Sequence, residues 1–319
     1  MKPLPSPAPM AHAGMLLRTL IVGLSFPLVA ALGNDLPLNL LTALRFFVAL
    51  LATLPFLPKA TGTWHPGVQG YVLYWLMGAC LAAFFATQFW VAQSISSVSM
   101  ASLFVSAPLF TFVIASFFGL ERVNFRLLSL LVAGATGALL LVREEASAGA
   151  FAIGRVETAY LLGCVALALH PVLSNWGLSR GWLTNDAATR SAWSLLTAAV
   201  LMTILGLLQE SPVDLLRLSG SDLLIVLYLG VFSSGLTFWL SQRAVPVLSP
   251  TEIMAYSYLV PVISLALLLI NEPSRLSWQW LPGTGLVLYC TCTLLWGNDD
   301  KRLRPETRPP VSACSETRQ

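Results

Sequence analysis

Ten long apolar runs separated by short polar breaks constrain this chain more than any other feature. A membrane-spanning α-helix needs about 20 apolar residues, because the hydrocarbon core of a bilayer is about 30 Å thick. Of the 319 residues, 56% are hydrophobic and only 10% are charged, whereas roughly a quarter are charged in soluble domains. The sequence therefore predicts an all-α membrane protein with ten transmembrane helices. Their predicted bounds are 14–32, 36–57, 71–92, 98–120, 127–142, 156–178, 187–208, 223–240, 250–270 and 276–296.

The positions of lysine and arginine predict the orientation of the chain, because cytoplasmic loops carry an excess of both. With a cytoplasmic N-terminus, twelve of the 18 basic residues fall on the cytoplasmic side. These are Lys2, Arg18, Lys59, Arg122, Arg126, Arg180, Arg243, Lys301, Arg302, Arg304, Arg308 and Arg318. Four fall outside, and two lie within predicted spans. We therefore predict a multi-pass protein of the plasma or inner membrane with both termini in the cytoplasm.

An internal repeat divides the chain into two halves. Residues 89–93 read FWVAQ near the end of the third span, and residues 238–242 read FWLSQ near the end of the eighth. Other landmarks recur at similar spacings, namely Pro27 to Arg45 with Pro171 to Arg190, and Phe89 to Glu121 with Phe238 to Glu272. Five spans per half is an odd number, so the second copy must enter the membrane from the opposite side. The pattern predicts two inverted five-helix repeats.

We place the first repeat at residues 14–143 and the second at 156–297. A flexible cytoplasmic segment, 1–13, is expected before them, and a cytoplasmic tail, 298–319, after them. Inverted repeats are typical of secondary transporters, whose substrate sites lie between the repeats near the middle of the membrane. The sequence has no Walker-type ATP motif, so a substrate gradient or a coupled ion, with a proton as the candidate, is expected to drive transport.

Other classes of protein fit the sequence less well. A membrane enzyme acting on a lipid usually needs clustered acidic or histidine residues at a membrane face, and the loops have no such cluster. We therefore expect no enzyme activity, no cofactor and no metal. The net charge of +3, on scattered basic residues, does not indicate nucleic acid as a partner.

Several short motifs carry a family resemblance. Residues 35–37 read DLP and 44–46 read LRF, while 119–122 read GLER and 271–273 read NEP. In this order the chain resembles the EamA-type branch of the drug/metabolite transporter superfamily over residues 14–297. The resemblance implies ten helices, cytoplasmic termini, a central cavity lined by spans one, three, four, six, eight and nine, and export of small metabolites. The chain departs from the family at 22–23, which reads VG where the family commonly has Trp-Gly.

Arg45 is the first candidate for substrate binding. It lies roughly nine residues into the second span, about 13 Å below the membrane surface. An arginine at that depth is expected to face the bundle interior, because facing lipid is costly. There it can bind an anionic group of a substrate, or it can fix the fold through backbone carbonyls or Asp35. Arg190 lies closer to a helix end, where its long side chain can reach the interface.

The repeated aromatic motifs supply the other binding candidates. Phe89, Trp90 and Gln93 share one helical stripe, because residues three and four apart are neighbours on a helix. The second half repeats this stripe with Phe238, Trp239 and Gln242. A flat apolar wall beside an amide suits an amphipathic organic solute. The alternative is an interfacial aromatic belt.

Four prolines lie inside spans, two in each half, at Pro27, Pro108, Pro171 and Pro261. They are candidates for hinges or cavity walls, and the alternative is a static kink. His170 and Glu252 are the candidates for proton coupling. Histidine changes charge near physiological pH. The alternatives are a packed neutral imidazole for His170 and a helix-start acid for Glu252.

Together these features predict a secondary transporter that exports an amino-acid-like or drug-like solute by alternating access. Its expected partners are a small-molecule substrate and the lipid bilayer. A lipid-linked or nucleotide-sugar carrier and a non-transporting receptor or assembly subunit are the alternatives. Glycines in spans five and ten predict close helix packing, and a homodimer contact there is left open. They are Gly134, Gly137, Gly283 and Gly285.

Overall fold

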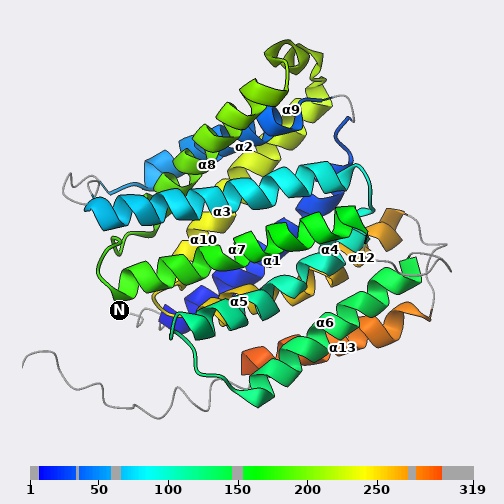
Figure 1. The fold of residues 1–319 in the computed structure, drawn as a ribbon. Helices are drawn as coiled ribbons and strands as arrows, with labels where there is room; N and C mark the ends of the chain where they lie inside the picture. Colours follow the sequence, from blue (N-terminus) through cyan, green and yellow to red (C-terminus); the bar gives the residue numbers. More distant parts are fainter. Residues whose placement is uncertain (1–6, 34–35, 59–65, 146–153, 272–277, 297–319) are drawn as a thin grey trace, which may run out of the picture.

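The computed structural model describes residues 7–33, 36–58, 66–145, 154–271 and 278–296, and every regular element in these ranges is a helix (Figure 1). The first half contains α1 (Pro7–Ala30), α2 (Leu38–Thr53) with the short helix η1 (Leu54–Phe56), α3 (Val68–Ala92), α4 (Ser97–Phe104), α5 (Ser106–Phe117) and α6 (Phe125–Glu145). The second half contains α7 (Arg155–Ser179), α8 (Ala187–Gln209), η3 (Pro212–Arg217), α9 (Gly220–Tyr228), η4 (Leu229–Leu236), α10 (Thr237–Ala244), α11 (Pro250–Ala255), η5 (Tyr256–Leu259), α12 (Val260–Asn271) and α13 (Trp280–Trp296).

These helices occupy all ten predicted spans. Eight of these spans are long and apolar enough to cross a membrane, and α6 adds a shorter apolar stretch, Phe125–Leu141. The tenth span is α13, with 17 residues. Span four consists of α4 and α5, span eight of α9, η4 and α10, and span nine of α11, η5 and α12. The prediction of an all-helical, ten-span chain is therefore confirmed over the described ranges.

The first helix begins earlier than predicted. Residues 7–13 were expected in a flexible segment, but they form the first turns of α1. Proline at the first helical position has the right φ for a helix start, and the alanines that follow favour helix. The Nδ1 atom of His12 lies 2.6 Å from the hydroxyl of Tyr256, which ties this turn to η5.

The contacts between helices are equivalent when the two repeats are exchanged. α2 packs on α8 and α6 packs on α13, so each pair joins equivalent helices of the two repeats. α3 packs on α7 and α8, while the equivalent span of the second half, η4 with α10, packs on α1 and α2. In Figure 1, α6 and α13 lie side by side at one edge of the bundle, and α2 and α8 lie at the opposite edge. This is the contact pattern of two inverted repeats.

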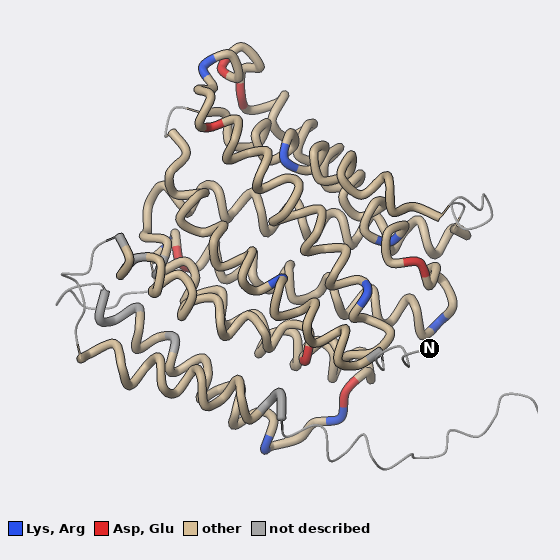
Figure 2. Tube along the Cα trace, turned by 180° about the vertical axis from the view of Figure 1, so that it is seen from behind, with Lys and Arg blue, Asp and Glu red and all other residues tan. Residues whose placement is uncertain are grey.

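Charged residues are sparse along the helices (Figure 2). In the described ranges the acidic residues lie in loops or in the first or last turn of a helix. Three arginines, by contrast, are buried: Arg18, Arg45 and Arg190. Arg18 was expected on the cytoplasmic side, and that expectation is wrong, because a helix that begins at Pro7 places Arg18 near its middle.

The four prolines fall into two kinds. In span four, α4 and α5 meet at Val105, three residues before Pro108, and in span nine the 3₁₀ helix η5 ends two residues before Pro261. Proline removes a backbone donor and clashes with the carbonyl four residues earlier. Pro27 and Pro171 lie within the continuous helices α1 and α7. Pro27 frees the carbonyl of Gly23, which accepts a hydrogen bond from the Ser264 hydroxyl at 3.3 Å.

The glycines of spans five and ten serve contacts within the chain. A Cβ on Gly137 would lie 3.1 Å from the carbonyl oxygen of Gly283, and one on Gly283 would lie 2.8 Å from that of Gly137. Gly134 faces the ring of Tyr258, whereas nothing lies within 4 Å of Gly285. Gly137 and Gly283 therefore allow α6 and α13 to approach closely.

Candidate functional site

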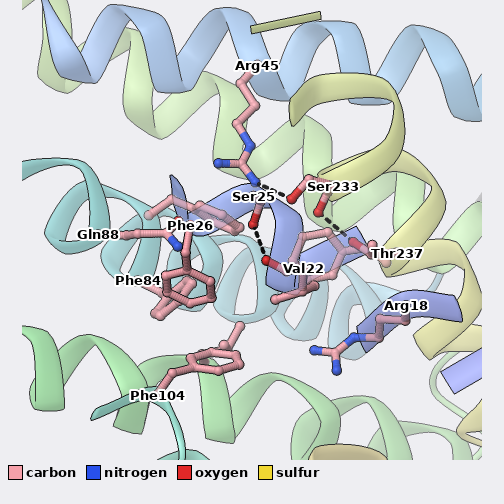
Figure 3. A pocket seen from close by; sticks show the side chains of 13 residues that line it. Arg18, Val22, Ser25, Phe26, Arg45, Phe84, Gln88, Phe104, Ser233 and Thr237 are labelled. Carbon is pink, nitrogen blue, oxygen red and sulfur yellow. Dashed lines mark hydrogen bonds between the residues drawn. The ribbon is translucent and has the colours of Figure 1, made fainter. Parts of the chain in front are cut away.

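A small cavity lies at the centre of the bundle, where the two repeats meet (Figure 3). The first repeat contributes α1, α2, α3 and α4, and the second contributes α7, η4 and α10. The volume is about 30 Å³, which is room for a few water molecules. The lining residues are Arg18, Val22, Ser25, Phe26, Arg45, Phe84, Phe85, Gln88, Phe104, Leu167, Ser233, Thr237 and Phe238.

The spans around the cavity differ in two respects from those that the family resemblance implied. Span two contributes Arg45 to the lining, and span nine contributes none of the lining residues. Span nine instead packs tightly against α1, since a Cβ on Gly23 would lie 2.6 Å from Cγ2 of Ile263. Glycine at position 23 therefore allows α12 to pack closely against α1.

Arg45 is almost completely buried, with 1% of its surface exposed. Its Nε donates to the hydroxyl of Ser234 at 2.8 Å, and its Nη2 donates to the hydroxyl of Ser233 at 3.1 Å. The guanidinium carbon also lies 4.3 Å from the centre of the Phe85 ring, in the geometry of a cation–π contact. Its Nη1 is buried and has no hydrogen-bond partner among the described residues. The neutral partners therefore hold the side chain without neutralising its charge.

The two serines come from η4, a π-helical stretch in span eight. π-helical segments are rare and are frequently found at functional sites. Close approach of η4 to α2 depends on glycine, because a Cβ on Gly230 would lie 2.5 Å from Cγ1 of Val48 and 3.0 Å from the carbonyl oxygen of Arg45. This contact brings Ser233 and Ser234 within hydrogen-bonding distance of the guanidinium.

Arg18 and Gln88 complete the polar lining. Arg18, from α1, is 6% exposed, and it makes no hydrogen bond or ion pair with a described residue. In Figure 3 its guanidinium lies at the opposite end of the group of side chains from Arg45. Gln88, from α3, is 3% exposed, and its Oε1 has no partner among the described residues. The lining thus contains two guanidinium groups, one free amide oxygen and no carboxylate.

Of the six residues in the predicted stripes, Phe238 alone lines the cavity. Phe89 is buried beside the lining, with its ring centre 5.9 Å from the guanidinium carbon of Arg45. Trp90 is 48% exposed. Gln93 is exposed where α3 ends. Trp239 is partly buried and contacts Arg243 and Phe56. The structure therefore does not bring either stripe to the cavity as a unit.

Gln242, the last member of the second stripe, binds Arg190. Its Oε1 accepts hydrogen bonds from Arg190 Nε at 2.8 Å and from the Ser174 hydroxyl at 2.6 Å. Its backbone carbonyl accepts another from Arg190 Nη2, and Nη1 of the same arginine donates to the carbonyl of Thr184 at 2.6 Å. Three helical spans are joined in this way: α7, α8 and α10.

The two candidates for proton coupling lie outside the cavity lining. The ring of His170 meets that of Phe238 edge to face, with centres 5.6 Å apart, and its Nε2 has no partner among the described residues. Glu252 caps α11, accepting a hydrogen bond from the backbone N–H of Ser249 at 2.8 Å. The described residues contain no group of three or more His, Cys, Asp or Glu side chains able to hold a metal ion.

The sequence analysis missed Arg18, Gln88 and the two serines of η4. Arg18 lies four residues after the predicted start of the first span, and it was therefore assigned to the cytoplasmic side. The alanine-rich run before it indicated an earlier start, which would have placed Arg18 inside the membrane. Nothing in the sequence distinguishes a π-helical segment from an ordinary apolar helix, so the serines carried no such signal.

Comparison with known proteins identifies the family. A model of the EamA-like transporter family matches residues 10–143 and again residues 156–296. One solved structure, described as "Crystal structure of protein", superposes with a TM-score of 0.70 at 19% sequence identity, covering 94% of this chain and 99% of that one. At this identity the likeness shows the fold alone. A search of curated proteins finds no match. With one match to the family model in each half, the chain belongs to the EamA-like transporter family and is a multi-pass membrane transporter of the drug/metabolite transporter superfamily.

Proposed function

We propose that the protein is a secondary exporter that moves a small organic metabolite out of the cytoplasm, with the central cavity as its substrate site. One observation supports this site above all others: Arg45 lines the cavity at the interface of the two repeats, and its buried Nη1 has no hydrogen-bond partner among the described residues. An arginine that only fixed the fold would be expected to have partners for all its donors, since an unpaired buried polar group is costly.

Alternating access accounts for the small size of the cavity. About 30 Å³ is far below the roughly 300 Å³ or more of a typical ligand pocket, so the walls must separate before an organic solute can enter. The helix breaks beside Pro108 and Pro261 lie in equivalent spans of the two halves. We propose these breaks as the hinges, because the backbone there has already left the α-helical hydrogen-bond pattern.

An untargeted comparison of metabolites tests this proposal. Cells that overproduce the protein should release at least one small metabolite to the medium and retain less of it than cells without the protein. Arg45→Gln should lose most of this effect at an equal membrane level, whereas Arg243→Gln, which removes an exposed guanidinium outside the cavity, should keep it.

Three outcomes contradict the proposal in different ways. Unchanged release by Arg45→Gln rejects the cavity as the site. Absence of any solute flux in reconstituted vesicles favours a receptor or assembly subunit. Flux confined to nucleotide sugars or lipid-linked sugars favours the alternative carrier function.

A further inference from the structure

We infer that the transported metabolite is an organic dianion with an apolar body, bound between Arg18 and Arg45. This inference rests on the proposed function, because it specifies the substrate class of the same site.

The charge of the lining is the first argument. Arg18 and Arg45 are 6% and 1% exposed, and neither has an acidic partner among the described residues. The acidic side chains of these ranges lie in loops or at helix ends, away from the cavity. A buried charge without a counterion is strongly unfavourable. Two negative charges on a ligand would supply the counterions that the protein lacks.

The free hydrogen-bond donors are the second argument. Arg45 uses Nε and Nη2 for the two serines and leaves Nη1 without a partner. All the donors of Arg18 are unused within the described residues. A guanidinium with free donors is the preferred partner of a carboxylate, which it can bind through two parallel hydrogen bonds.

The separation of the two arginines indicates two anionic groups rather than one. In Figure 3 the guanidinium groups of Arg18 and Arg45 lie at opposite ends of the group of side chains that line the cavity. The two arginines come from different helices, α1 and α2, and Arg45 is held at its end by the serines of η4. A ligand with an anionic group at each end, such as a dicarboxylate, can therefore reach both guanidinium groups.

The remaining walls define the body of the ligand. They are mainly aromatic and aliphatic, and include Phe26, Phe84, Phe104, Leu167 and Phe238. Without a carboxylate in the lining, an amine has no anionic partner there. An apolar linker between two carboxylates matches both the rings and the charges.

Binding to the purified protein in lipid nanodiscs tests this inference with three probes that share a 3-phenylpropanoyl unit. The probes are 2-phenylsuccinate, a dianion, 3-phenylpropionate, a monoanion, and the neutral diamide of phenylsuccinate. We expect the dianion to bind at least about tenfold more tightly than the monoanion, because one charge-assisted hydrogen-bonded contact is lost. The diamide should bind more weakly than either.

Arg18→Gln should abolish the preference for the dianion and leave the affinity for the monoanion nearly unchanged. Arg18 has no protein partner among the described residues, so this change leaves no partner group unsatisfied. The matched control Arg243→Gln removes an exposed guanidinium and should leave all three affinities unchanged.

Equal binding of dianion and diamide, or a dianion preference that survives Arg18→Gln, overturns the inference. Its failure is distinguishable from failure of the proposed function. Vesicle flux of neutral or cationic metabolites alone would retain the exporter and reject the dianion. Selective binding of the dianion without any flux would retain the site chemistry and reject transport.

Discussion

At the residue scale, two equivalent arginines have different roles in the two repeats. Arg45 and Arg190 occupy matching places in the two repeats, yet only Arg45 reaches the cavity. Arg190 is held by Gln242 and by the carbonyl of Thr184. One repeat therefore uses its buried arginine at the candidate site, and the other uses it to join three helices.

Gln242→Leu is expected to destabilise the protein by about 3 kcal/mol, because a charged donor and a buried hydroxyl lose their shared acceptor. The measurement is the change in unfolding free energy in detergent. Its control is Gln69→Leu, at an exposed glutamine in the first turn of α3. An exposed change is expected to cost less than about 0.5 kcal/mol. Equal costs for the two variants would contradict the assigned role of Gln242.

The sequence predicted only some of the residues that line the cavity. The failures have physical reasons. Depth within an apolar run was enough to identify Arg45 as buried. The same rule failed for Arg18, because the depth of this residue in the membrane depends on where the first helix begins. The stripes failed to predict the lining because helical neighbours three or four residues apart can still have different surroundings, as buried Phe89 and exposed Gln93 do.

At the scale of elements, the π-helical stretch η4 is what brings span eight against α2. Gly230→Ala should force these two helices apart, since its Cβ would lie 2.5 Å from Val48 and 3.0 Å from the carbonyl oxygen of Arg45. Overpacking of this kind costs about 1–3 kcal/mol. It should also weaken the hydrogen bonds from Arg45 to the serines, and so reduce transport of the exported metabolite.

Gly220→Ala provides the control on the same span. Nothing lies within 4 Å of a Cβ at this position, at the start of α9, so the change should be neutral or slightly stabilising. Unfolding free energies of both variants in detergent provide the comparison. A Gly230→Ala protein as stable and active as Gly220→Ala would show that the close approach of η4 and α2 is dispensable.

The sequence predicted the existence and order of the spans well, because hydropathy depends on composition. It predicted their internal breaks poorly. η4 is as apolar as the helix α9 before it, and hydrogen bonding that shifts from α to π or 3₁₀ is decided by packing against neighbouring spans. Only the prolines beside two of the breaks signalled that the helices there would be irregular.

At the scale of the whole molecule, the path of the chain determines which loops share a face of the bundle. Arg122, Arg126, Arg180 and Arg243 lie at the end where α1 begins, while Arg143, Arg155 and Arg217 lie at the other. By the excess of basic residues on the cytoplasmic side, the end where α1 begins should be cytoplasmic.

Two single cysteines at the ends of α8 test this orientation, in a background with the five native cysteines replaced. Asn185 and Ser211 are both exposed. They lie just before and just after α8, and therefore on opposite faces of the bundle. A membrane-impermeant maleimide added to intact cells should label Ser211→Cys and spare Asn185→Cys, and permeabilised cells should show both labelled. The reverse pattern in intact cells would place both termini outside. The end of the bundle where α1 begins would then face outward, contrary to the prediction from the basic residues.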